Sequence, residues 1–317
     1  MKQNLMLALS LVALLVVAVA PLFAGDLYSE ISVGNPLVYG NLAIYPIYLP
    51  GGGEKLGDIL TLDEALETGK FKITELEEGA SVNLLEVHNK TNKYVVLLAG
   101  QIIHGAKQDR IISYDTVVPP KTTYFVDVFC VEAGRWNEVS DSFSYKGEIA
   151  PSAIRYSSQE EQNQGAIWDS VSSINEKNKV YSDSEALSAS YNSEEYQELM
   201  EKYQSAFQDI AQDDEVVGVL AVSEGSIQAG DIFANHDLFA KVWDRLLTSY
   251  SMDAALSSGL GSLPSVGDME KYLVALQNAD RESVYQDEVQ QRTDLNGDGV
   301  SAYELEYADK KLHINLY

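Results

Sequence analysis

The chain has 317 residues, 45% of them hydrophobic, which is enough for one large core or two modest domains and excludes disorder throughout. Its 48 acidic and 22 basic residues give a formal net charge of −26 at pH 7. Because binding to phosphate backbones depends on clustered Lys and Arg, this charge excludes nucleic acid as the expected partner.

The N-terminus carries a targeting pattern. An uncharged apolar run extends from Leu5 to Ala24 and is preceded by Lys2. This pattern predicts a secretory signal peptide over residues 1–24, cleaved after Ala24. A run of about 20 apolar residues can also span a bilayer, so an uncleaved membrane anchor stays open as the alternative. Both interpretations predict an exported body that lies in the periplasm, outside the cell or at the cell surface.

Turn residues separate short apolar runs in the first half of the chain and predict a β-rich region over residues 25–150. Thr61 and Glu64 have the spacing of a capping box, which predicts a short helix over residues 62–68. We expect strands at 31–49 (two strands), 72–75, 81–88, 94–98, 109–114 and 122–131. Cys130, the only cysteine, lies in the last of these and is expected to be a buried, unreactive thiol.

The pattern changes to helical after Gln159. Apolar residues at helix spacing predict helices over 167–174, 196–210, 237–250 and 269–276, with one β-hairpin over 215–228. The predicted fold class is therefore α+β: a β-rich N-terminal half, a mostly helical C-terminal half packed against it, and a small helix-loop-helix tail. The expected domains are residues 25–280, of which 151–280 are mainly helical, and a tail over 281–317.

The tail contains a candidate calcium loop. Asp294, Asn296 and Asp298, followed by a glycine, match the oxygen ligands and sharp turn that open an EF-hand loop. The closing position holds leucine, so either Glu304 or Glu306 must supply the last carboxylate if the loop is one residue short. We predict weak calcium binding, in the range of about 0.1 to 1 mM typical of extracellular modules. The alternative is a simple Asn-Gly-Asp-Gly turn.

A stretch of polar residues lies among strongly apolar flanks near the middle of the chain, as AGQIIHGAKQDR and then CVEAGRW. With VPP between them, and with QGAIWDSV, VGVLAVSEGSIQAGDIF and LLTSYSMDA downstream, these motifs resemble the ARG- and rhodanese-phosphatase-superfamily-associated protein domain over residues 26–255. The family name implies a genomic association with ADP-ribosylglycohydrolase-like and phosphatase-like proteins. The resemblance assigns motif positions to Glu75, Gly100, Gly105, Lys107, Gln108, Arg110, Glu132, Gly134, Arg135 and Trp136. His104 and Ala106 depart from it, since glycine is expected near Ala106.

The polar side chains of this stretch suggest two functions. Lys107 and Arg110 can offer cationic donors to a small anionic ligand, with Gln108 and Arg135 as further ligand-binding candidates. Glu132 is the candidate general base. The structural alternative is a buried network of Glu, Arg and Lys side chains that fastens strands together, since buried charges are normally paired.

We therefore carry two hypotheses from the sequence. The first is an exported, acidic, non-catalytic module that binds a ligand or has a structural role, with a calcium-binding tail and no nucleic-acid partner. A membrane is a partner only if the N-terminal segment stays uncleaved. The second is a hydrolase acting on a small anionic, nucleotide-like or phosphoester-like substrate. An open pocket lined by Lys107, Gln108, Arg110 and Glu132 would favour the hydrolase, and a buried, mutually paired cluster of these residues would count against it.

Overall fold

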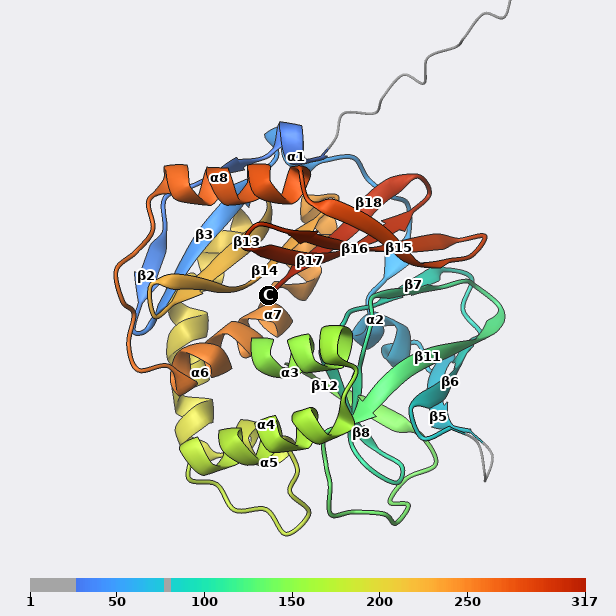
Figure 1. Cartoon of the computed structure of the whole chain (residues 1–317). Coiled ribbons are helices and arrows are strands. Elements are labelled where there is room, and N and C mark those ends of the chain that lie inside the picture. Colours follow the sequence, from blue (N-terminus) through green and yellow to red (C-terminus); the bar gives the residue numbers. More distant parts are fainter. Residues whose placement is uncertain (1–26, 77–80) are drawn as a thin grey trace, which may run out of the picture.

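The computed structural model describes residues 27–76 and 81–317 (Figure 1). The predicted signal peptide of residues 1–24 lies outside the described residues. No helix within 27–76 or 81–317 is both long and apolar enough to cross a membrane.

The largest sheet in the described part of the chain has nine strands and joins the beginning of the chain to its end. β3 and β13 pair antiparallel, and so do β14 and β18, so strands from near both termini meet in one sheet. The strands in this sheet are β1 (Ser32–Val33), β2 (Leu37–Tyr39), β3 (Leu42–Tyr48), β13 (Val216–Ser223), β14 (Ser226–Phe233), β18 (Lys310–Leu316), β17 (Val300–Tyr307), β16 (Gln290–Gly297) and β15 (Asp280–Gln286).

Two smaller sheets form the other β region, to the lower right in Figure 1. Their facing side chains share one core, to which Leu62, Val95 and Val128 contribute. The strands are β12 (Phe143–Ile149), β8 (Gln101–Gly105), β9 (Arg110–Ile112), β11 (Thr122–Cys130), β6 (Leu84–Asn89) and β5 (Phe71–Glu75) in one sheet, and β10 (Thr116–Val118), β7 (Tyr94–Leu97) and β4 (Ile59–Leu60) in the other.

Helices cover both faces of the large sheet (Figure 1). Alternate residues of β13 point to opposite faces: Leu220 packs in the core that contains Met269 of α8, whereas Val219 packs in the core that contains Trp243 of α7. The helices are α1 (Leu27–Glu30), α2 (Leu62–Glu67), α3 (Ser152–Tyr156), α4 (Gln164–Lys177), α5 (Ser188–Tyr191), α6 (Glu194–Phe207), α7 (His236–Leu256) and α8 (Val266–Gln277), with single turns at η1 (Pro50–Gly52), η2 (Ser157–Glu161) and η3 (Gln208–Gln212).

Most individual elements of the first half agree with the sequence predictions. The predicted short helix is α2, where the backbone N–H of Thr61 donates to Oε2 of Glu64 at 2.9 Å, as a capping box requires. The predicted strands appear as β5, β6, β7, β9 and β11, and the predicted hairpin as β13 and β14. Residues 31–49 form three strands, β1 to β3, instead of the two predicted, and β4, β8, β10 and β12 were not predicted.

The prediction of a mostly helical C-terminal half is wrong. The protein is β-rich, with 37% strand and 32% helix, and β13 to β18 make up most of the large sheet. The helix-loop-helix tail is likewise wrong, since residues 280–316 form four antiparallel strands. The physical reason is a misread period: apolar side chains recur at every second residue, at Leu312, Ile314 and Leu316, which is the spacing of a strand rather than of a helix.

Candidate functional site

Arg135 ties together the ends of the strands in the central polar stretch. It lies just after β11, and its guanidinium is 2.6 Å from Glu132 and 3.1 Å from Asp109. It also donates to the backbone carbonyl of Ala106 at 2.7 Å. Asp109 and Ala106 belong to the loop that joins β8 to β9. One side chain therefore connects this loop to the end of β11.

His104 extends this network toward β12. Its Nδ1 is 2.8 Å from Asp109 and its Nε2 is 2.7 Å from Glu148. Burial lowers the pKa of His104, but the hydrogen bonds to the two carboxylates outweigh burial and raise the pKa to about 9. His104 is therefore an imidazolium held between two acids at neutral pH.

Arg110, a predicted anion-binding residue, is completely buried; both terminal nitrogens of its guanidinium have partners, whereas its Nε has no partner among the described residues. It donates to Oε1 of Gln108 at 3.0 Å and to Oε1 of Glu75 at 3.3 Å. Gln108 in turn donates to the backbone carbonyl of Glu132 at 2.6 Å. The fold thus brings Gln108, Arg110, Glu132 and Arg135 together, and it pairs them with one another or with neighbouring residues.

Lys107 is the exception among the predicted ligand-binding residues. It is only half-buried, and its Nζ lies 5.7 Å above the ring of Trp136, which is 58% exposed. The turn that carries it has glycine-like backbone geometry, because Ala106 has a positive φ of 43°. This explains why a glycine is expected near that position. Lys107 lies at the surface, apart from the buried contacts of Arg110.

The geometry leaves Glu132 poorly placed to act as a base. Its side chain is 5% exposed and accepts from Arg135 and, at 3.0 Å, from the backbone N–H of Asp109. A general base needs a free oxygen within reach of the substrate proton. Burial also raises the pKa of the Cys130 thiol, which is 4% exposed, so this stretch has no activated nucleophile among the described residues.

A second buried network, which the sequence reasoning missed, joins the large sheet to the smaller ones. Arg155 of α3 is 2.6 Å from Asp231 of β14, and His313 of β18 lies between Asp231 at 3.0 Å and Asp115 at 2.6 Å. The Tyr250 hydroxyl of α7 also donates to Asp231. Burial lowers the pKa of His313, but the two carboxylates outweigh it and raise the pKa to about 9. The network connects α3, β14, α7 and β18 and, through Asp115, the segment between β9 and β10.

One sequence signal could have found this network. Asp231 and His313 are single ionisable residues inside apolar strands, in AGDIF and LHINL. A buried charge is costly unless it is paired, so each such residue predicts a partner from elsewhere in the chain. The sequence does not say which partner.

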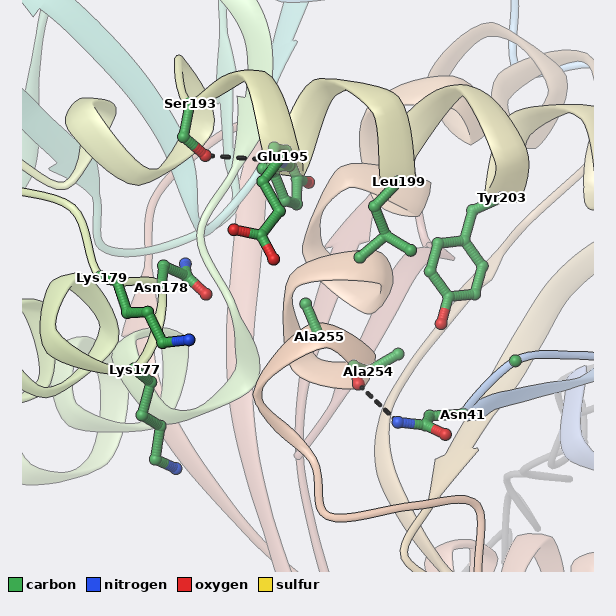
Figure 2. A pocket seen from close by; sticks show the side chains of 12 residues that line it. Asn41, Lys177, Asn178, Lys179, Ser193, Glu195, Leu199, Tyr203, Ala254 and Ala255 are labelled. Atoms are coloured by element: carbon green, nitrogen blue, oxygen red, sulfur yellow. Dashed lines mark hydrogen bonds between the residues drawn. The ribbon is translucent and has the colours of Figure 1, made fainter.

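An open pocket of about 340 Å³ lies between the β2–β3 turn and the ends of three helices (Figure 2). We call it the lysine pocket. Lys177 at the end of α4 and Lys179 just beyond it lie on one side, and Glu195 and Leu199 of α6 lie on the other. The remaining lining comes from Gly40, Asn41, Asn178, Ser193, Tyr196, Tyr203, Ala254 and Ala255. Neither lysine forms an ion pair with any residue that the structure describes.

The C-terminal residues predicted to bind calcium converge only in part: Asn296 donates to Asp294 at 2.9 Å, but Glu304 lies apart from both. Asp294 and Asn296 lie on β16, and Asp298 lies in the turn to β17. In the β16–β17 register Asp294 pairs with Tyr303, whereas Glu304 pairs with Thr293, so Asp294 and Glu304 point to opposite faces. Within residues 27–76 and 81–317 no group of three or more His, Cys, Asp or Glu side chains could hold a metal.

Asp294 and Glu304 also have unlike surroundings. Glu304 is 1% exposed and accepts from the Tyr28 hydroxyl at 2.6 Å and from Lys311 at 3.0 Å. Burial and the nearby charges of Glu160 and Glu282 raise the pKa of Asp294 to about 6. Glu304 is therefore satisfied by neighbours, while Asp294 is crowded by like charges.

The fold and these contacts define a β-rich protein whose three sheets are fastened by buried charge networks, with an open pocket beside the largest sheet. The chain belongs to the ARG and Rhodanese-Phosphatase-superfamily-associated Protein domain family, whose model matches residues 30–317. The match includes the C-terminal strands, which lie beyond the motifs that carry the resemblance in the sequence. Neither a curated protein nor a solved structure gives a significant match to the chain.

Proposed function

We propose that this protein is an exported, non-catalytic binding module that holds a small anionic ligand in the lysine pocket. The observation that carries the proposal is that the arginines of the buried networks are paired with carboxylates while two lysines in the pocket are not paired with any described carboxylate. Arg110, Arg135 and Arg155 have carboxylate partners, whereas Lys177 and Lys179 face an open hollow with no ion pair to a described residue. Unpaired cationic donors in a concave site are free to bind an anion.

The lining of the pocket suits a small organic ligand. Asn41 donates to the backbone carbonyl of Ala254 at 3.5 Å, and Asn178 donates to the sulfur of Met252 at 3.3 Å, so both amide groups are oriented by the scaffold. Leu199 and the Tyr203 ring add apolar surface. A few oriented polar groups on a mostly preformed wall are typical of ligand sites.

The hydrolase hypothesis has less support. The lysine pocket contains neither Glu132 nor any of the other residues predicted for that activity. Of those residues, only Lys107 has a side chain that is not already engaged in buried hydrogen bonds. The central polar stretch is better explained as a fastening for the β8–β9 loop and the end of β11.

A thermal-shift experiment with the purified protein tests the proposal. The probes are inorganic phosphate, citrate and AMP, each at millimolar concentration. We expect at least one of them to raise Tm in the wild type and not in the Lys177→Ala/Lys179→Ala double variant. Lys202→Ala, an exposed lysine on α6 outside the lysine pocket, is the matched control and should keep the shift.

Two outcomes contradict the binding proposal: no shift with any of the three anions, or an equal shift in the double variant. The double variant should lose less than about 0.5 kcal/mol of stability, because exposed, unpaired side chains contribute little. Export is tested separately by N-terminal sequencing of the protein from a secreting host. The first residue should be Gly25, and a mature chain that still begins at Met1 would contradict cleavage.

A further inference from the structure

The edge of the large sheet at β2 is apolar and exposed. Leu37, Val38 and Tyr39 are 37%, 48% and 39% exposed, and among the described strands β2 pairs only with β3. Natural sheets usually protect an edge with charge or with a covering element, because an open edge pairs readily with another chain. The opposite edge strand, β15, follows that rule, since it begins Asp-Arg-Glu and is almost entirely exposed.

The β2–β3 register shows which backbone groups are free at this edge. Tyr39 pairs with Leu42 across the two-residue turn Gly40-Asn41, so these two residues exchange both hydrogen bonds of a tight hairpin. Pairing in an antiparallel ladder alternates, and the N–H and C=O of Val38 therefore point away from β3. Pro36, the next residue with the same orientation, has no N–H. Val38 is thus the main outward donor of this edge.

An acidic helix runs beside the edge. A groove of about 730 Å³ lies between β2 and α6, lined by Tyr39 on one side and by Glu198, Glu201 and Lys202 on the other. The Tyr39 ring contacts the Tyr203 ring of α6 edge-on, with 5.5 Å between the ring centroids. Glu194, Glu195, Glu198 and Glu201 are all exposed on this helix. The groove thus carries more negative than positive charge, with Glu198 and Glu201 beside Lys202, and it borders the exposed apolar strand β2 at Tyr39.

We propose that β2 is a docking edge for an extended, basic segment of a protein partner, which adds to the sheet as a further strand. The N–H and C=O of Val38 would pair with the incoming backbone, and its basic side chains would lie over Glu198 and Glu201. Strand addition draws its affinity from main-chain hydrogen bonds and its selectivity from alternate side chains. A second copy of this acidic chain fits less well, because it would place like charges against α6.

Fluorescence anisotropy with labelled peptides tests this inference. The probes are the hexapeptide Lys-Val-Lys-Val-Lys-Val and its acidic counterpart Glu-Val-Glu-Val-Glu-Val. We expect the basic peptide to bind about tenfold more tightly or better, and the difference to shrink at high salt. Val38→Pro removes the outward N–H at an edge position where proline is tolerated, and should weaken binding about tenfold. Val38→Thr keeps that N–H and is the matched control.

The double variant Glu198→Gln/Glu201→Gln should bind the basic peptide about fivefold more weakly, and salt should affect this binding less. If Val38→Pro fails to fold, a basic peptide with N-methylated valines replaces it, because that peptide cannot donate to the sheet edge and must bind the wild type more weakly. Equal binding of the two peptides, or binding that ignores both Val38→Pro and N-methylation, overturns the inference. A dimer that forms through β2 and is lost in Val38→Pro would assign the edge to a second copy, and also overturns it.

Discussion

Two sets of cationic side chains in this protein have opposite surroundings. Arg110 and Arg155 are 0% and 1% exposed and are bonded to carboxylates, whereas Lys177 and Lys179 are exposed and have no ion pair to a described residue. Removing one partner from a buried ion pair leaves the other charge buried and unpaired, which is strongly destabilising. We therefore infer that Arg110 and Arg155 stabilise the fold. The charges of Lys177 and Lys179 remain accessible to a ligand. In this protein the polar residues within apolar sequence are paired and buried, while the proposed ligand site lies on the surface.

The strongest test of the comparison is Arg155→Met. The substitution leaves Asp231 buried at 0% exposure without its main cation, and we expect a loss of about 3 to 5 kcal/mol in the free energy of unfolding. Urea denaturation measures the loss, with Lys202→Ala as a surface control that should change stability by less than about 0.5 kcal/mol. A loss below about 1 kcal/mol would show that the network is not a fastening.

The pH dependence of stability tests both networks together. Contacts with carboxylates raise the pKa values of His104 and His313 to about 9, above the ordinary value of 6.5. The folded state therefore favours the protonated rings, and this stabilisation is complete below about pH 6.5 and is lost as the pH rises through 9. The urea concentration at the midpoint of unfolding, measured from pH 6 to pH 10, should therefore fall as the pH rises from about 6.5 through 9.

His88→Gln is the control for this measurement, because it leaves both buried histidines in place and should keep the same decline. His104→Gln should make the decline shallower. A midpoint that stays constant from pH 6 to pH 9 would mean that these two histidines are not held as imidazolium ions.

The smallest expected effect concerns Asp294. Burial and neighbouring acids raise its pKa to about 6, so the folded state disfavours its charge, and stability from this group falls as pH rises through 6. Asp294→Asn should then raise stability at pH 7 by up to about 1 kcal/mol, measured as a higher Tm. Glu306→Gln is a control on the same hairpin.

Calcium binding by the tail stays a prediction, and the same variant tests it. If Asp294 binds calcium, millimolar calcium must raise the Tm of the wild type and not that of Asp294→Asn. A calcium shift that survives the substitution would place the ion elsewhere, and no shift in either protein would end the prediction.

Local sequence was a good guide where one short signal decides the structure. The capping box at Thr61 and Glu64 predicts α2, and the turn around Glu224-Gly225 predicts the β13–β14 hairpin. The prediction for the tail was wrong because its Asn-Gly-Asp-Gly segment suits both a calcium loop and a tight hairpin turn. Pairing with β14 resolves that ambiguity, since it places β18 inside the large sheet and buries every residue from Leu312 to Leu316.

The candidate site was predicted only in part. The sequence indicated that Gln108, Arg110, Glu132 and Arg135 act together, and they do lie in one network. It gave no sign of the lysine pocket, because Asn41, Lys177, Lys179 and Glu195 come from separate segments with no shared motif. Such a site exists only after the β2–β3 turn and three helices have packed together.

By itself, the sequence determined the acidic surface, the predicted export, the family and the positions where charge is placed among apolar strands. Tertiary structure alone decided which charges are paired, since pairing depends on contacts such as His313 with Asp115, which are 198 positions apart. It also decided which cations remain open to solvent. The physical reason is that composition and local pattern fix the cost of burying a charge, whereas only the folded chain supplies the partner that offsets this cost.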